Sequence, residues 1–492
     1  MKIFLLTFIR RALVGILCLS VLPAFGQQNN SLYFMDQLPQ SNQLNPATQP
    51  LFGFYLGLPV ISSIELNAGN SAVSFKDVIM YSPQLDSTVT FLNNQKAQSD
   101  FLSRFSKTNS FYTDTRIDLF TIGLRVNRNY YSFSVSERME GRFNIPYGLI
   151  NFAVKGNLDS IGINSLTQTI DLSTLGIKAS WYREYGLGFS REIDDKITFG
   201  IRGKLLFGKA NIITKTSNVY VANSGYQSWE PHSTIEVNSS IPNLDVYTNS
   251  ESKIDSLKFR DMNNADDIRN MLMVKNNVGV ALDLGIVYKP VYFLNISASL
   301  LDLGYIHWKS NLHSLTQDGS YNLKGVKVNG IDSANVNQAL LDTLKDKFTY
   351  KSNSDPYMTT LSPKLYAGAQ LRILNDLGIG VLTRLQIIES SLKSQYTFSL
   401  NFYPANAFLL TLSYTIADQM YDNFGVALSS KLGPLQWYIM SERIPLYYDK
   451  DKSGAYIPAY AKNINLRFGI NIVIGKKRHK RTNKDMPLVE IQ

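Results

Sequence analysis

Six charged residues occupy positions on predicted β-strands that alternate with apolar residues. They are Arg202, Lys204, Asp283, Arg372, Arg384 and Arg467. Because successive side chains of a strand point to opposite faces, these charges project away from the apolar face of their sheet. Guanidinium, ammonium and carboxylate groups gathered there can pair with one another or contact a passing ligand. From the sequence, a structural network of paired charges and a substrate path both stay open.

Patterns that would support catalysis are weak. The segment Gly203–Lys209 imitates a phosphate-binding loop, but Ala210 replaces the required Ser or Thr and the segment continues a strand. The histidines His232, His307 and His313 lie in polar stretches without metal-ligand spacing. We therefore expect no enzyme activity, no metal and no cofactor, with a hydrolase that pairs a serine with one of these histidines as the open alternative.

The strands that must position the six charges share one pattern. In the last strand, Ile464, Leu466, Phe468, Ile470, Ile472 and Ile474 alternate with Asn463, Asn465, Arg467, Gly469 and Asn471. The same alternation recurs in residues 196–208, 277–288, 396–402 and 410–416. Strands of this length, with one apolar and one polar face, are typical of transmembrane β-barrels. A soluble sandwich would also alternate, but soluble strands average only about 5 or 6 residues.

The composition supports a barrel over helical membrane spans. Mean hydropathy is −0.10, and after the N-terminal region no run approaches about 18 consecutive apolar residues. Only a closed barrel can then satisfy every backbone group inside a bilayer. The predicted fold is all-β: a transmembrane antiparallel barrel over residues 51–475.

Turn-forming residues set the expected number of strands. Short connections are predicted at residues 127–129, 193–195, 289–290, 375–376, 404–406 and 433–434. Long polar stretches separate them, near residues 69–113, 139–175, 213–276, 304–362 and 444–461, with shorter ones near 390 and 419. Six short and seven long connections join 14 strands, although Pro59 interrupts the first. We expect long extracellular loops, one of which contains an amphipathic helix over residues 336–348. An even strand count places both termini in the periplasm.

The ends of the chain differ from its body. Residues 1–26 combine Lys2, Arg10 and Arg11 with an apolar run and small residues at 24 and 26, which predicts a cleaved signal peptide. An uncleaved helical anchor is the alternative, but the run is short for a bilayer. The only cysteine, Cys18, lies in this run, so the mature chain has no thiol chemistry. Of the net charge of +10, this leader carries +3 and the basic tail, residues 476–492, carries +4. We interpret the tail as a solvated periplasmic segment and assign no nucleic-acid role.

A compact segment, residues 27–50, precedes the first strand. It contains Tyr33-Phe34-Met35, Leu38-Pro39-Gln40 and Asn45-Pro46-Ala47. With Leu466-Arg467-Phe468-Gly469 near the end, these motifs resemble an uncharacterised Bacteroidetes family of outer-membrane barrels. That family is distantly similar to the long-chain fatty-acid transporter (FadL-type) barrels. The resemblance implies 14 strands, a hatch or plug formed by residues 27–50 with Asn45, Pro46 and Ala47 in it, and hydrophobic cargo.

The sequence thus predicts a porin-like outer-membrane channel or transporter, with passive uptake of hydrophobic small molecules through the lumen. Its partners would be outer-membrane lipid, the hydrophobic cargo and envelope proteins. A non-transporting scaffold, or a component of surface assembly or secretion, is the alternative. An apolar path through the lumen would favour transport, whereas a lumen blocked by paired charges would favour the scaffold.

Overall fold

The computed structural model describes residues 30–82, 87–155, 170–225, 228–260, 276–320, 323–324, 349–352, 355–388, 391–405, 407–417, 420–444, 448–450, 456–458 and 462–476. The predicted leader, the basic tail beyond Lys476 and the predicted helix at 336–348 lie outside these residues. None of the helices within the described ranges is long and apolar enough to cross a membrane.

The main sheet closes on itself as an antiparallel barrel with 14 wall positions, as the sequence predicts. Closure occurs where the last strand pairs with the first, for example Leu56 with Ile472 and Leu66 with Leu466. The wall strands are β1 (Phe52–Gly57) with β2 (Ile64–Asn70), β5 (Thr108–Val126), β6 (Asn129–Pro146), β8 (Gly176–Glu192), β9 (Ile197–Gly225), β13 (Asn277–Val291), β14 (Leu294–Trp308), β18 (Tyr357–Thr360) with β19 (Lys364–Arg372), β20 (Leu377–Ile388), β21 (Ser391–Ala405), β22 (Phe408–Ala417), β23 (Met420–Leu432), β24 (Leu435–Ser441) and β27 (Asn463–Lys476).

Two wall positions are each made of two strands in succession. The first strand breaks at residues 58–63, around Pro59, yet β1 and β2 both pair with β5 on one side and β27 on the other. The second break, at residues 361–363, separates β18 from β19 along β14. Each pair therefore counts as one position in the closed wall.

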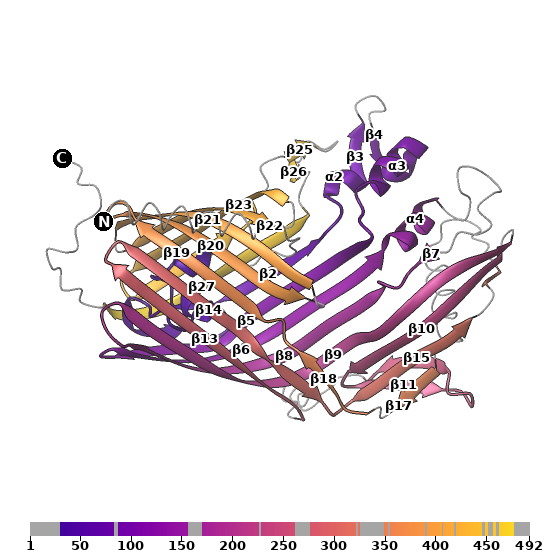
Figure 1. The fold of residues 1–492 in the computed structure, drawn as a ribbon, viewed down its shortest axis with the longest axis horizontal. Helices are drawn as coiled ribbons and strands as arrows, with labels where there is room; N and C mark the ends of the chain where they lie inside the picture. The colour runs from indigo at the N-terminus through magenta and orange to yellow at the C-terminus, as the bar shows by residue number, and fades with distance from the viewer. Residues whose placement is uncertain are drawn as a thin grey trace.

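Short connections join neighbouring strands at one end of the barrel, which we call the turn end; the opposite end is the loop end (Figure 1). One predicted turn, Lys289-Pro290, is misplaced because β13 continues to Val291 and turns at 292–293. Pro290 is tolerated there because the pairing of β13 with β9 ends at Tyr288, so the missing N–H breaks no bond between them. Pro404 and Ala405 likewise belong to β21, and the connection that follows is shorter than predicted.

The outer face of the wall carries the predicted apolar rows. Phe199, Val280, Ile286, Phe398 and Leu412 are all between 43% and 48% exposed. The residues that alternate with them are buried within the barrel, so the face predicted to contact lipid is the outward one.

Further strands extend the sheet at the loop end. The expectation that strand 196–208 ends at Gly208 is wrong, because β9 continues to Gly225. Its pairing with β13 ends at Gly208, and beyond that point β9 pairs with β10, which pairs in turn with β15. Figure 1 shows these strands extending beyond the cylinder. The additional strands are β3 (Ile79–Ser82), β4 (Ser87–Thr90), β7 (Ile170–Asp171), β10 (Ser228–Ser240), β11 (Leu244–Thr248), β12 (Ile254–Phe259), β15 (Leu312–Ser320), β16 (Leu323–Lys324), β17 (Thr349–Ser352), β25 (Tyr448–Lys450) and β26 (Tyr456–Pro458).

In the described residues the helices are short, and none of them forms part of the wall. They are η1 (Asn30–Phe34), η2 (Pro39–Gln43), α2 (Phe75–Val78), η3 (Phe91–Asn93), α3 (Gln95–Leu102) and α4 (Tyr147–Lys155). In α3, Asn94 caps the first turn by accepting from the Ala97 N–H, and buried Phe101 stacks on Phe91. The helices α2, α3 and α4 gather at the loop end, whereas η1 and η2 belong to the segment that precedes β1 (Figure 1).

Candidate functional site in the barrel lumen

Residues 30–50, which we call the hatch segment, lie inside the barrel and are largely buried. Leu32, Met35 and Leu38 have no exposed surface and pack on Tyr438 and Met440 of the wall. Full burial of such side chains contributes on the order of 2 kcal/mol each. Apolar side chains in η1 and in the link between η1 and η2 therefore attach the segment to one side of the lumen.

Two aromatic side chains attach the hatch segment to a second part of the wall, formed by β14, β19 and β20. Tyr33 stacks on Tyr366 of β19 with ring centroids 5.6 Å apart, and Phe34 packs in the same cluster beside Leu382. The ring of Phe34 packs directly against the backbone of Gly380, because a Cβ at this position would lie only 2.7 Å from Phe34 Cε2. Small residues in β20 thus make room for the hatch.

Polar contacts fix the hatch segment in register. Gln40 and Asn471 exchange two side-chain hydrogen bonds of 2.7 and 3.0 Å. The Ser31 N–H donates to the Glu442 carboxylate at 2.7 Å, and the Gln43 amide donates to Asp118 at the same distance. These bonds satisfy groups that would otherwise be buried without partners.

The Asn45-Pro46-Ala47 motif forms the tightest contact with the wall. The Asn45 side chain accepts the Ala47 N–H at 2.9 Å, which folds the tripeptide into a compact turn. Its amide donates to the Tyr33 hydroxyl at 3.2 Å. Gly285 and Gly200 face this turn, and a Cβ on either would lie 2.1 Å from Asn45 Oδ1 and 2.2 Å from the Pro46 carbonyl carbon, respectively.

On the loop-end side of the hatch segment lies a continuous set of ion pairs that we call the charged layer. It consists of Arg116, Asp118, Glu184, Arg202, Lys204, Asp283, Asp302 and Lys364. Lys204 is central, with its Nζ 2.6 Å from Asp302, 2.8 Å from Asp283 and 3.7 Å from Glu184. Four acids balance four bases, and every member is buried. Such mutual pairing is what makes charges tolerable in a buried environment.

A β-bulge aims one acid of the charged layer. Asp302 has a φ of 61° and falls where the register between β13 and β14 shifts. Aspartate adopts this left-handed conformation more readily than most residues. Its backbone N–H donates to Asp283 at 2.8 Å, and its carboxylate lies between Lys204 and Lys364. The bulge therefore brings the two acids together in the lumen.

The structure brings together three of the six charged residues singled out from the sequence: Arg202, Lys204 and Asp283. Arg467 pairs with Glu65 at 3.2 Å, and Arg384 donates to Gln395 at 3.0 Å, so both are buried in the lumen beside the layer. Arg372 is not brought in. It lies exposed at the last position of β19, at the turn end.

Five members of the charged layer were missed from sequence: Arg116, Asp118, Glu184, Asp302 and Lys364. Arg116 and Glu184 occupy the inward positions of β5 and β8, so the alternation used for the later strands applies to them too. Asp302 carries no such signal, because the bulge changes which residues point inward. The predicted histidine alternatives lie elsewhere: His232 stacks on Tyr220 and His313 contacts the Tyr350 hydroxyl at 2.7 Å, both in the sheet at the loop end.

The charged layer and the hatch segment pack against one another in the lumen. The cavity that remains among Gln43, Leu44 and the surrounding charges has a volume of about 30 Å³, space for no more than about two water molecules. Toward the loop end, an apolar cluster that includes Trp308, Tyr357 and Leu312 lines the inner face of the wall. The apolar lining therefore ends at the charged layer.

Comparison with solved structures gives likenesses in fold. The toluene transporter TbuX of Ralstonia pickettii has 10% identity and a TM-score of 0.42, covering 92% of this chain and 99% of that one. A FadL homologue of Pseudomonas aeruginosa has 8% identity and a TM-score of 0.34, with 87% and 90% covered. The toluene transporter TodX of Pseudomonas putida has 9% identity and a TM-score of 0.34, with 92% and 93% covered.

Sequence comparison adds a family. No curated protein matches this chain. One family model, described as a family of unknown function, DUF5723, matches residues 46–442. The match covers most of the barrel, from the Asn-Pro-Ala turn to the end of β24. The chain belongs to the family of unknown function DUF5723.

Proposed function

We propose that this protein is an outer-membrane barrel that admits hydrophobic small molecules when the hatch segment leaves the lumen. One observation carries the proposal: the hatch segment lies in the lumen, and packing and hydrogen bonds made by its side chains join it to the wall. Such an attachment can be released without breaking the barrel, because none of the wall pairings includes the hatch segment.

The membrane location is supported by the outward face. Exposed apolar side chains recur along the strands around the wall, and a soluble protein would leave this continuous apolar surface in water. Closure of the sheet removes unpaired edges from most of the wall, as a bilayer requires. In the proposed orientation the turn end faces the periplasm, together with both chain termini.

The proposed passage is passive, and its cargo is hydrophobic. The apolar cluster around Trp308 and Tyr357 supports such a cargo on the loop side of the lumen. Below it, the charged layer must open along with the hatch, since the two are joined by Arg202 and Gln43. Opening therefore requires a concerted rearrangement, and we propose no catalytic step for the lumenal charges.

A second function, a non-transporting scaffold for envelope proteins, is favoured by the charged layer itself. Its four acids and four bases pair within 3.8 Å, and the cavity among them has a volume of only about 30 Å³, as expected for a permanently closed lumen. In that case the sheet at the loop end, built on β9, β10 and β15, would supply the surface for protein partners.

Mass spectrometry of small molecules that co-purify with the mature barrel from native membranes tests the two functions. The comparison is a variant that lacks residues 27–50. Enrichment of a hydrophobic species in the complete barrel, and its loss or change in the variant, supports uptake through the lumen. Absence of any enriched species from both forms, with protein partners bound instead, contradicts transport and supports the scaffold.

A further inference from the structure

The carboxyl group of Glu442 lies beside the start of the hatch segment. Glu442 directly follows β24 and is only 1% exposed. One of its oxygens accepts the Ser31 N–H at 2.7 Å, and its own N–H donates to the Asn465 side chain at 3.2 Å. The bond to Ser31 places this carboxyl group where the described part of the hatch segment begins.

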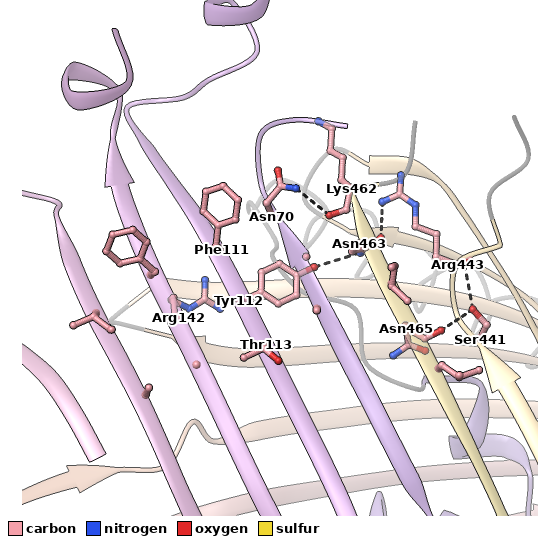
Figure 2. A pocket seen from close by; sticks show the side chains of 18 residues that line it. Asn70, Phe111, Tyr112, Thr113, Arg142, Ser441, Arg443, Lys462, Asn463 and Asn465 are labelled. Carbon is pink, nitrogen blue, oxygen red and sulfur yellow. Dashed lines mark hydrogen bonds between the residues drawn. The ribbon is translucent and has the colours of Figure 1, made fainter. Parts of the chain in front are cut away.

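The second oxygen of the carboxyl group, Oε2, is buried and has no hydrogen-bond partner. The neighbouring base does not supply one. Figure 2 shows the Arg443 side chain directed at Asn463, to which its guanidinium donates at 2.7 Å. In the part of the chain that the structure describes, no base forms an ion pair with Glu442. A buried carboxylate without a cation is costly, and protonation would only turn the unpartnered acceptor into an unpartnered donor.

A second acceptor without a donor belongs to Asn30, the residue before Ser31. Its amide nitrogen donates to Gln395 and to Thr397, each at 3.0 Å, but its side-chain oxygen is buried and has no hydrogen-bond partner. Buried polar groups of folded proteins almost always have partners. The two orphaned oxygens therefore indicate a ligand with a positive charge and several N–H donors.

The chain itself can supply this ligand. Cleavage after Gly26, as the sequence predicts, leaves an α-ammonium group with three N–H donors on Gln27. Residues 27–29 lie outside the described residues. The backbone from the Gln27 nitrogen to the Ser31 nitrogen is four residues long and spans at most about 14 Å. Because Ser31 is bonded to Glu442, the α-ammonium group can reach this carboxyl group through a single turn of the chain.

We propose that Glu442 binds the amino terminus of the mature chain, with an ion pair between the Gln27 α-ammonium and the Glu442 carboxylate. The pair forms only after the leader is removed, because the Gln27 nitrogen of the precursor is part of an uncharged peptide bond. Processing thus adds a charged contact between the hatch segment and the wall. The inference rests on the proposed function only in that the hatch segment occupies the lumen of a processed barrel.

The intact mass and terminal sequence of the barrel purified from native membranes provide the first test. A free α-amine on an N-terminal glutamine attacks the side-chain amide and forms pyroglutamate with loss of ammonia. An amine that is held protonated in an ion pair does not attack. We therefore expect an uncyclised Gln27 as the first residue. Pyroglutamate, an uncleaved leader or a different first residue would overturn the proposal.

Acetylation of the folded mature barrel at pH 7 tests the role of Glu442. An ordinary α-amine then reacts before lysines, because its pKa is about 7.7–8.0 and theirs about 10.4. We expect the Gln27 amine to react about tenfold more slowly than in the urea-unfolded chain, and Glu442→Gln to abolish this protection. Glutamine keeps an oxygen for the Ser31 N–H, so the variant removes mainly the charge. Glu236→Gln, from an exposed pair with Lys215, is the matched control and should react like the wild type.

Proteolysis of the hatch segment, measured in parallel, separates the ion pair from a general loosening. A reactive amine in Glu442→Gln, with the hatch segment cleaved no faster than in the wild type, supports the proposal. Equal acetylation of the wild type and Glu442→Gln overturns it, and so does faster cleavage of the whole segment in the variant. Neither measurement involves a cargo, so failure here is distinct from failure of transport.

Discussion

The Arg202 guanidinium donates to the backbone carbonyl of Asn42 at 2.7 Å and to its side-chain oxygen at 2.6 Å, while its other terminal nitrogen lies 3.3 Å from Asp283. One side chain of the wall thus joins the hatch segment to the charged layer. Because a guanidinium offers several donors in a fixed plane, it can hold all three oxygens at once, which a lysine cannot reproduce.

Arg202→Met should loosen the hatch while sparing the barrel. Asp283 keeps Lys204 at 2.8 Å, so the substitution does not strand a carboxylate. The hatch loses the two short hydrogen bonds to Asn42, each worth about 1.5–3 kcal/mol for a charged donor, and a longer one of 3.4 Å to the Gln43 carbonyl. In planar bilayers we expect the frequency of channel opening to rise at least about tenfold.

Lys364→Met is the matched control for this experiment. It also removes one cation from the charged layer and also leaves its partner, Asp302, with Lys204 at 2.6 Å. Its ammonium contacts Asp302 of the wall, so we expect the channel to stay closed. Similar conductance in the two variants would contradict a specific role of Arg202 in holding the hatch.

Gly285→Ala should displace the Asn-Pro-Ala turn from the wall. The added Cβ would lie 2.1 Å from Asn45 Oδ1, a separation that requires the turn to move. Gly200→Ala should act in the same way on Pro46, whereas Gly203→Ala, with open space around it, should have no effect. Limited proteolysis from the turn end measures the exposure of residues 30–50. If all three variants are cleaved like the wild type, the hatch is not seated by these glycines.

The strand periodicity predicted much of the fold. Alternation in 277–288 and 463–474 identified which faces point outward, because lipid or core contact imposes a period of two on any strand that lies between an apolar and a polar environment. Turn residues such as Gly433-Pro434 identified most of the short connections. The continuation of β9 beyond Gly208 was not predictable in this way. A strand that extends beyond the barrel has no regular apolar face, and the prediction of strands depended on that face.

The charged layer was predictable only in part. Arg202, Lys204 and Asp283 follow the alternation, but their partners lie up to 98 residues away along the chain, and pairing across the lumen depends on the stagger of the strands. Asp302 enters through a bulge that reverses the local alternation. Arg372 follows the pattern and yet is exposed, because periodicity gives the direction of a side chain and not its distance from the end of the barrel.

Lys204→Met should destabilise the barrel strongly. The substitution removes the cation that Asp283, Asp302 and Glu184 share, so all three acids lose a partner at once and each keeps only its second one. Loss of one partner of a buried pair typically costs about 3–5 kcal/mol. Lys215→Met is the control, because its pair with Glu236 at 3.1 Å is largely exposed and such pairs contribute about 0–1 kcal/mol. Urea unfolding of barrels in vesicles compares the two. A similar small loss for both would show that the charged layer is well hydrated rather than closed.

Ile286→Arg tests whether the outward face contacts lipid. Ile286 is 44% exposed on the outer face of β13, well inside the length of the strand. In a bilayer, an arginine on the lipid face costs about 2–4 kcal/mol near the midplane, whereas at a position exposed to water it costs almost nothing. Leu257→Arg on β12, which is 52% exposed outside the barrel, provides the aqueous control. We expect the folding yield into phospholipid vesicles to fall sharply for Ile286→Arg and to stay unchanged for Leu257→Arg. If Ile286→Arg folds as well as the control, this face lies in water and the membrane-spanning assignment is wrong.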